Sequence, residues 1–237
     1  MYSICITGVS ILLAAALYVV LLRAGYISKI MIKLGLKDQT VKPNWTMFSW
    51  ESSLKQLVYD ADVVFFGDSI TRGGNFQRYF PDLKIVNLGC TGDTLEGMRG
   101  RLSMIKTLSP QKVFLMGGIN GLTDHNIEKC IAKYEQLLTD IREVLPDTQI
   151  YVQSLLPIST EKQRQLLCHD RAIRCFNESI RKLSEKHEVK YVDLYPLYEQ
   201  NGQIEPTLTV DGMHIKPEAY ERWAEMIHCY VCIEKVN

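Results

Sequence analysis

The stretch Ala61-Asp-Val-Val-Phe-Phe-Gly-Asp-Ser-Ile70, or ADVVFFGDSI, decides the fold class. Residues 61–66 contain a short continuous apolar run, which is typical of a strand covered on both faces, and Gly67 and Asp68 end it. Four similar runs come later in the chain, at residues 85–88, 113–116, 150–152 and 189–192. The sequence therefore predicts five buried strands that belong to one parallel sheet.

Helical patterns separate these runs. Apolar residues recur at helical spacing over residues 127–145, with Asn126 as the N-cap, and over residues 161–186. A last helix opens with Pro217, and a short helix is expected at residues 47–59. Strands that alternate with helices predict an α/β fold, in which ligands bind at the carboxyl ends of the strands.

Residues 1–23 are predicted to form a transmembrane anchor. No charged side chain occurs between Tyr2 and Leu22, and about 20 apolar residues at roughly 1.5 Å each match the hydrocarbon core of a bilayer. The alternative is a cleaved signal peptide, but residues 1–7 lack the Lys or Arg of its positive start. We therefore expect a single-pass membrane protein.

Residues 24–46 are predicted to be an amphipathic segment and a linker, which leaves residues 47–237 as one domain. Apolar residues at helical spacing share the segment with a stripe of lysines, Lys29, Lys33 and Lys37. Such a helix lies at a lipid interface or packs on its own domain. The positive charge after the span favours a cytoplasmic domain, although long domains often override this rule.

The composition excludes some classes of function. Lys plus Arg equals Asp plus Glu, at 27 each, so bulk charge indicates neither a nucleic-acid partner nor a strongly charged substrate. The 7 cysteines show no disulfide-scaffold spacing, and we interpret Cys229 and Cys232 as core residues. Because no cluster of His, Cys and Asp has metal-ligand spacing, we predict no metal and no cofactor.

Polar and small residues follow three of the predicted strands. Ser69 comes after the first strand, Gly89 ends the second, and Asn120 follows the third within Gly117-Gly118-Ile119-Asn120. A serine at the start of a helical turn is a candidate nucleophile. A glycine N–H and a side-chain amide are the kinds of donor that stabilise an oxyanion.

A carboxylate and a histidine follow the fifth strand. Asp211 stands three residues before His214 in Thr-Val-Asp-Gly-Met-His. A carboxylate that orients an imidazole, and an imidazole that takes a serine proton, would complete a catalytic triad with Ser69. Each signal alone is common, but together they fall at one edge of the predicted sheet.

The order of these motifs resembles the SGNH hydrolases, also called the GDSL esterase and lipase family. Four blocks carry the resemblance from about Asp62 onward: Gly67-Asp68-Ser69-Ile70, Gly89, Gly118-Ile119-Asn120 and Asp211-Gly212-Met213-His214. It implies a flavodoxin-like three-layer sandwich with Ser69 as the nucleophile, His214 as the base and Asp211 as its orienting group. It further implies an oxyanion hole formed by the Ser69 and Gly89 amides and the Asn120 side chain.

Two residues depart from the family pattern: Ile70 replaces the usual Leu, and Gly121 stands where Asp is common. The expected function is hydrolysis of a carboxylic ester, such as an acetylated carbohydrate, a lysophospholipid or another small acyl ester. An acyltransferase that uses the same triad is the alternative, followed by a non-catalytic ligand-binding module. The natural acyl group and the oligomeric state are not predicted, and for the side of the membrane the sequence gives only the weak preference for the cytoplasm.

Overall fold

A five-stranded parallel sheet forms the centre of the computed structural model, which describes residues 60–163 and 168–232. The strands are arranged in the order β2-β1-β3-β4-β5, the doubly wound order of flavodoxin-like folds. In that order β1 lies between β2 and β3, so the loops that follow these three strands are neighbours. The strand bounds are β1 Val63–Gly67, β2 Ile85–Gly89, β3 Lys112–Met116, β4 Gln149–Gln153 and β5 Lys190–Val192.

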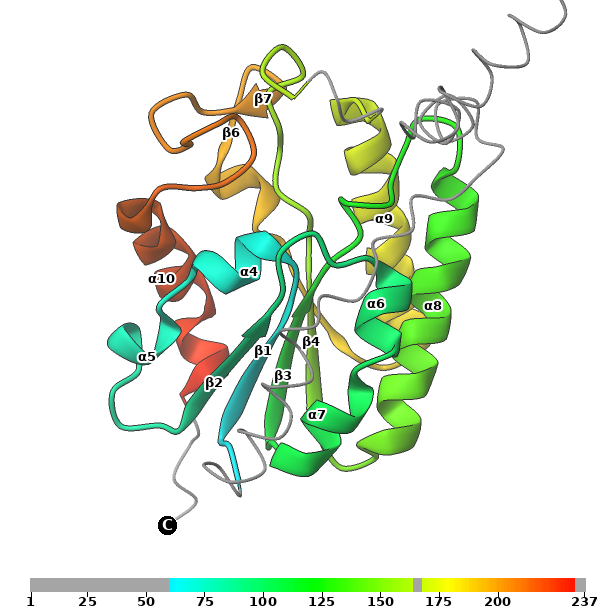
Figure 1. Cartoon of the computed structure of the whole chain (residues 1–237), viewed down its shortest axis with the longest axis vertical. Coiled ribbons are helices and arrows are strands. Elements are labelled where there is room, and N and C mark those ends of the chain that lie inside the picture. Colours follow the sequence, from blue (N-terminus) through cyan, green and yellow to red (C-terminus); the bar gives the residue numbers. More distant parts are fainter. Residues whose placement is uncertain (1–59, 164–167, 233–237) are drawn as a thin grey trace, which may run out of the picture. The chain divides into compact units, whose positions relative to one another are not determined.

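Helices cover both faces of the sheet and make a three-layer sandwich (Figure 1). One outer layer holds α4, α5 and α10, in which the Phe76 ring contacts the rings of Tyr220 and Trp223 edge-on. In the other layer α6 and α9 each pack against α8. The helix bounds are α4 Ser69–Gly73, α5 Phe76–Tyr79, α6 Leu95–Arg99, α7 Leu102–Leu108, α8 Ile127–Val144, α9 Asp170–Lys186 and α10 Tyr220–Val231.

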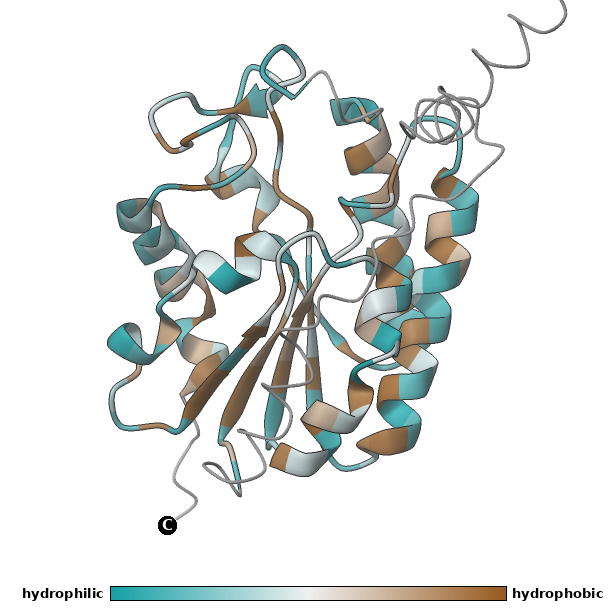
Figure 2. Cartoon of the chain, in the orientation of Figure 1, coloured by the Kyte–Doolittle hydropathy of each residue, from teal (hydrophilic) through white to brown (hydrophobic). Residues whose placement is uncertain are grey.

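The apolar core lies between the sheet and its helices. All residues of β1 and β3 are buried, and Figure 2 shows these strands as largely hydrophobic next to helices with one polar side. Phe65, Phe114 and Tyr151 are partners in register on adjacent strands, and their rings stack in a row across one face. Because the central strands cannot slip without moving these rings, their ends are held in place.

Most of the predicted elements are confirmed. All five strands form, whereas α9 begins at Asp170, nine residues later than the pattern from residue 161 predicts. The short helices α5 to α7 and the hairpin of β6 (Glu199–Gln200) and β7 (Gln203–Ile204) were not expected. The interpretation of Cys229 and Cys232 as core residues is wrong, because both side chains are exposed on α10 or just after it.

Several sequence predictions concern residues outside the described part of the chain. The anchor at residues 1–23, the amphipathic segment and linker at 24–46, and the helix at 47–59 all belong there. Within residues 60–163 and 168–232, no helix is both long and apolar enough to cross a bilayer. The anchor therefore stays a prediction from sequence.

Candidate active site

The turn from β1 into α4 places Ser69 at the carboxyl edge of the sheet. Ser69 is the first residue of α4, and Asp68 is the N-cap, whose Oδ1 accepts a hydrogen bond from the Ile70 amide at 2.9 Å. The first amides of a helix have no acceptor within the helix. The Ser69 hydroxyl therefore lies beside backbone N–H groups at the positive end of a helical turn.

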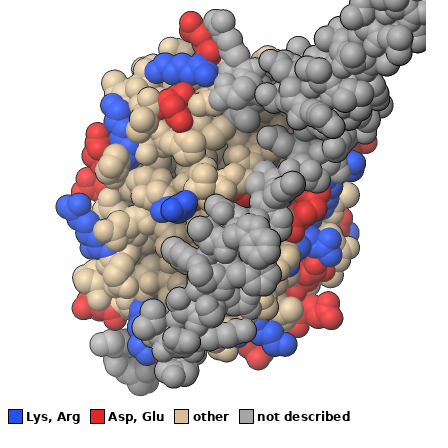
Figure 3. All heavy atoms as spheres, viewed as in Figure 1, with Lys and Arg blue, Asp and Glu red and all other residues tan. Residues whose placement is uncertain are grey.

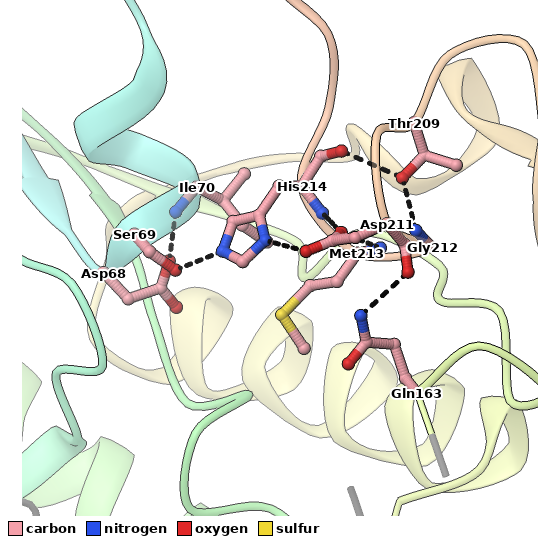
Figure 4. A network of polar contacts seen from close by, with 9 residues as sticks. All are labelled: Asp68, Ser69, Ile70, Gln163, Thr209, Asp211, Gly212, Met213 and His214. Atoms are coloured by element: carbon pink, nitrogen blue, oxygen red, sulfur yellow. Dashed lines mark hydrogen bonds and ion pairs between the residues drawn. The ribbon is translucent and has the colours of Figure 1, made fainter. Parts of the chain in front are cut away.

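His214 and Asp211 extend from the Ser69 hydroxyl in a line (Figure 4). The Ser69 Oγ lies 2.9 Å from His214 Nε2, and His214 Nδ1 lies 2.7 Å from Asp211 Oδ2. The side chains of His214 and Asp211 are 41% and 45% exposed, so the line opens to solvent. One ring nitrogen thus faces a hydroxyl while the other faces a carboxylate, which is the geometry of a serine-histidine-aspartate triad.

The loop that carries Asp211 and His214 is held by its own hydrogen bonds. Thr209 Oγ1 accepts from the Gly212 amide and donates to the His214 carbonyl, each at 2.9 Å. The buried Gln163 side chain donates to the Asp211 carbonyl at 2.9 Å, as Figure 4 shows. These contacts fix the backbone on both sides of Asp211, so the His214 ring is aimed by the loop as well as by the carboxylate.

Hydrogen bonds keep the Asp211 carboxylate ionised. Its partial burial alone would raise its pKa, but the His214 ring and the amides of His214 and Met213 all donate to it. Together these bonds hold the pKa of Asp211 below its usual value. A negative Asp211 favours the imidazole tautomer with its proton on Nδ1, which leaves Nε2 free to accept from Ser69.

The second carboxyl group of the turn, Asp68, has the opposite environment. It is fully buried, and its Oδ2 has no hydrogen-bond partner among the described residues. Burial raises the pKa of Asp68 to about 7, with a contribution from Asp93, while the Ile70 amide and the charges of His214 and Arg101 oppose the rise. Between about pH 4 and pH 7 the two carboxyl groups near Ser69 therefore differ in protonation, with Asp68 mostly neutral and Asp211 ionised.

The predicted oxyanion donors come to the same edge, but they differ in availability. Asn120 Nδ2 donates one hydrogen bond, to the Asp93 carbonyl at 2.9 Å, and a side-chain amide has a second N–H to offer. The Gly89 amide already donates to Asn87 Oδ1 at 2.8 Å. For Gly89 to bind an oxyanion, that bond must be shared or exchanged.

Gly89 has a further role that only a glycine can fill. A Cβ at this position would lie 2.1 Å from the Arg72 amide nitrogen and 2.5 Å from its Cα, which are backbone atoms of α4. The end of β2 therefore contacts α4 backbone to backbone. At Gly121, by contrast, a Cβ would have no atom within 4 Å, so the family's usual Asp is not required for packing there.

Four positioning residues were missed in the sequence: Asn87, Asp93, Gln163 and Arg101. Asn87 Nδ2 donates to the carbonyls of Thr71 and Gly74 while its Oδ1 accepts from the Gly89 amide, so it ties β2 to the middle and the C-terminal end of α4. Nothing in their local sequence marks them, because most of their partners belong to other elements of the fold. Arg72 and His125, two further polar residues close to the motifs, are both exposed.

A family model decides the relationship of the chain to known proteins. The model of the GDSL-like lipase/acylhydrolase family matches residues 65–222, which include Ser69, Gly89, Asn120, Asp211 and His214. The chain belongs to the GDSL-like lipase/acylhydrolase family. It is accordingly a hydrolase that acts on ester bonds. No curated protein matches its sequence.

Solved structures of low sequence identity share the fold of this GDSL-family chain. A protein from Streptococcus pneumonia named for platelet activating factor is 21% identical, with a TM-score of 0.70 over 92% of this chain and 99% of that one. A GDSL-like lipase from Bacteroides thetaiotaomicron is 20% identical, with a TM-score of 0.67 over 80% of this chain and 97% of that one. A mutant acetyl-xylooligosaccharide esterase from Geobacillus Stearmophilus is 16% identical, with a TM-score of 0.57 over 76% of this chain and 98% of that one.

Proposed function

We propose that this enzyme cleaves small acyl esters by acyl transfer through Ser69. The observation that carries the proposal is the line from Ser69 Oγ to His214 Nε2 and from His214 Nδ1 to Asp211, at 2.9 and 2.7 Å. In this arrangement His214 takes the hydroxyl proton as Oγ attacks the ester carbonyl carbon. Asp211 holds the ring and stabilises the imidazolium that forms.

The reaction then proceeds in two halves. The tetrahedral intermediate collapses, the bond to the alcohol oxygen breaks, and His214 gives its proton to the leaving alcohol. Water next attacks the acyl-Ser69 ester with His214 as base, and the acid is released with Ser69 restored. Because all of these proton transfers pass through His214 Nε2, one well-placed imidazole serves both halves.

The negative oxygen of each intermediate would lie near the Ser69 amide and the Asn120 side chain. The Ser69 N–H stands at the helix start, and the second N–H of Asn120 is oriented because the first is bound to Asp93. Gly89 would join them when its amide turns from Asn87 toward the substrate. Each such donor contributes on the order of 10²–10³ in rate.

A short acyl group on an uncharged alcohol, such as an acetylated carbohydrate, is the substrate class that we propose. The side chains of His214 and Asp211 are close to half exposed, which suits an acyl group carried on a large polar molecule. Among the described residues seen in Figure 3, charged side chains of both signs are interspersed around uncharged ones, which gives no preference for an ionic substrate of one sign. One protein of similar fold is named as an acetyl-xylooligosaccharide esterase.

The test is a comparison of the full chain with Ser69→Ala on p-nitrophenyl acetate, butyrate and octanoate. We expect turnover that depends on Ser69 and falls as the acyl chain lengthens. A preference for octanoate would replace the short-acyl proposal with a lipid esterase. Equal rates for the two proteins would reject Ser69 as the nucleophile.

We also propose that residues 1–23 anchor the enzyme in a membrane. The proposal is supported by the absence of any charged side chain from Tyr2 to Leu22. The full chain should then sediment with membranes and resist extraction with alkaline carbonate. Release by carbonate would reject the span. Protease treatment of intact cells would report the side, and the positive charge after the span leads us to propose protection, that is, a cytoplasmic domain.

A further inference from the structure

Arg101 lies buried beneath the candidate site, on the face of the sheet opposite α5 and α10. Its guanidinium lies over the Phe66 ring, 4.1 Å from the centroid, and only 5% of the side chain is exposed. Its Nε donates to Asp93 Oδ2 at 2.7 Å. The charge of Arg101 is paired with the Asp93 carboxylate, so no uncompensated charge is buried at this position.

The two terminal guanidinium nitrogens of Arg101 donate to backbone carbonyls at the ends of two strands. One nitrogen donates to the Gly67 carbonyl at 2.8 Å, and the other donates to the Leu88 carbonyl at 2.6 Å. Gly67 ends β1 two residues before Ser69, and Leu88 directly precedes Gly89. The guanidinium thus binds the backbone just before two of the three proposed oxyanion donors.

The third proposed donor is connected through Asp93. Arg101 binds the Asp93 side chain, and the Asp93 carbonyl accepts from Asn120 Nδ2 at 2.9 Å. Asn120 itself lies in the loop after β3, on the other side of β1 from Gly89. A single cation therefore reaches the surroundings of Ser69, Gly89 and Asn120, which come from three different strand ends.

We propose that Arg101 is a positioning residue that holds the three oxyanion donors in their relative places. This inference rests on the proposed function of Ser69, and it assigns no contact between Arg101 and the substrate. A planar fork with fixed donors can bind two carbonyls and a carboxylate at once, whereas the single ammonium of a lysine cannot reproduce that spacing. The residue matters for its geometry as well as for its charge.

Arg101→Lys is the main test, because it keeps the charge and loses the fork. We expect kcat per folded enzyme to fall about 10²-fold, since a displacement of about 1 Å has that effect, while KM changes little. The folded fraction is measured by circular dichroism and thermal unfolding. Arg101→Gln, which is neutral, replaces the lysine variant if that variant does not fold.

Repeating the substitution in an Asn120→Ala enzyme separates a role in positioning the oxyanion donors from a role in stabilising the fold. In an Asn120→Ala enzyme one of the three donors is already gone, so Arg101→Lys should lower kcat by much less, on the order of tenfold. Lys112→Met is the matched control, because Lys112 is a buried cation at the opposite edge of the sheet. Its small effect on kcat should be the same in both backgrounds.

Two results would overturn the positioning role: an unchanged kcat per folded Arg101→Lys enzyme, or an equal loss in the wild-type and Asn120→Ala backgrounds. Failure of the proposed function is a different result, in which Ser69→Ala turns over esters as fast as wild type. In that case amide hydrogen exchange over residues 88–93 still tests Arg101. Exchange there should be faster in Arg101→Lys and unchanged in Lys112→Met, and equal exchange in all three proteins would reject the inference.

Discussion

Two buried cations lie at opposite edges of the sheet, and they differ in the carbonyl groups that they bind. Arg101, at the carboxyl edge, donates to Gly67 and Leu88, which adjoin the candidate site. Lys112, the first residue of β3, donates to the carbonyls of Tyr230, Val231 and Cys232 at the end of α10, at 2.6, 3.4 and 3.3 Å. The same kind of contact therefore serves loops at one edge and a helix end at the other.

The difference shows how this fold separates stability from function. At the amino edge a cation satisfies the last carbonyls of a helix and favours its dipole, which stabilises the packing of α10 on the sheet. At the carboxyl edge the polar groups have no such regular partner, because three loops must meet there. Substitutions of the residues that hold the triad and the oxyanion donors should therefore change activity more than stability, and substitution of Lys112 at the amino edge should do the reverse.

The largest effect at the carboxyl edge is expected from Asp211→Asn. An amide can hold the His214 ring but favours the wrong tautomer, so kcat should fall about 10³–10⁴-fold with a nearly unchanged melting temperature. Steady-state kinetics on p-nitrophenyl acetate, together with thermal unfolding, measures both quantities. A loss of less than about tenfold would show that Asp211 does not orient the base.

Gly89→Ala should have the next largest effect. The added Cβ would meet backbone atoms of Arg72 at 2.1 and 2.5 Å, so β2 and α4 must move apart and carry Ser69 with them. We expect kcat to fall about 10²-fold. Gly121→Ala is the matched control, because its Cβ has no neighbour within 4 Å and its rate should stay at the wild-type value. Equal rates for the two variants would contradict the close approach.

Asp68→Asn should change the dependence of stability on pH. The pKa of Asp68 is raised from 3.8 to about 7 in the folded chain, so its contribution is fully present below about pH 4 and is lost as pH rises through about 7. Asparagine keeps an acceptor for the Ile70 amide and cannot ionise. The variant should lack this loss, which is on the order of a few kcal/mol, in urea unfolding at pH 5 and pH 8. Parallel pH profiles for the two proteins would argue against a buried, protonated Asp68.

Lys112→Met tests the amino edge and should have the smallest effect on catalysis. Loss of the ammonium leaves carbonyls at the end of α10 without a charged donor, and the free energy of unfolding should fall by about 1–3 kcal/mol. Measured by urea unfolding and ester turnover on the same sample, stability should drop while kcat per folded enzyme stays constant. A fall in kcat comparable to that of Arg101→Lys would remove the distinction between the two edges.

The same contrast explains what could be predicted from sequence. The five strands, Ser69 and the pair Asp211 and His214 are marked by local patterns, because each depends on an apolar run or on a short motif. The structure brings the three side chains into hydrogen-bonding distance, while their catalytic roles remain proposals. The start of α9 was predicted too early: the helical pattern begins at residue 161, but residues 161–163 form a turn and the helix begins at Asp170.

Arg101, Asp93 and Asn87 could not be found in the same way. Each acts through partners in other loops, such as the carbonyl of Gly67, which lies 34 positions from Arg101 in sequence. Backbone carbonyls carry no sequence signal, so a contact to one is visible only when the fold is known. The occupied Gly89 amide could not be predicted for a different reason: its acceptor, Asn87 Oδ1, lies only two residues away, but the bond depends on the rotamer of the Asn87 side chain.

The most direct measurement for the central claim is covalent capture of the nucleophile. An alkyl fluorophosphonate forms a bond to an activated serine oxygen and releases fluoride, so intact mass and peptide mapping report which residue reacted. We predict one adduct per chain, on the peptide that contains Ser69, and none in His214→Ala. An adduct on another residue, or no adduct in a protein that turns over esters, would contradict the assignment of Ser69 as the nucleophile.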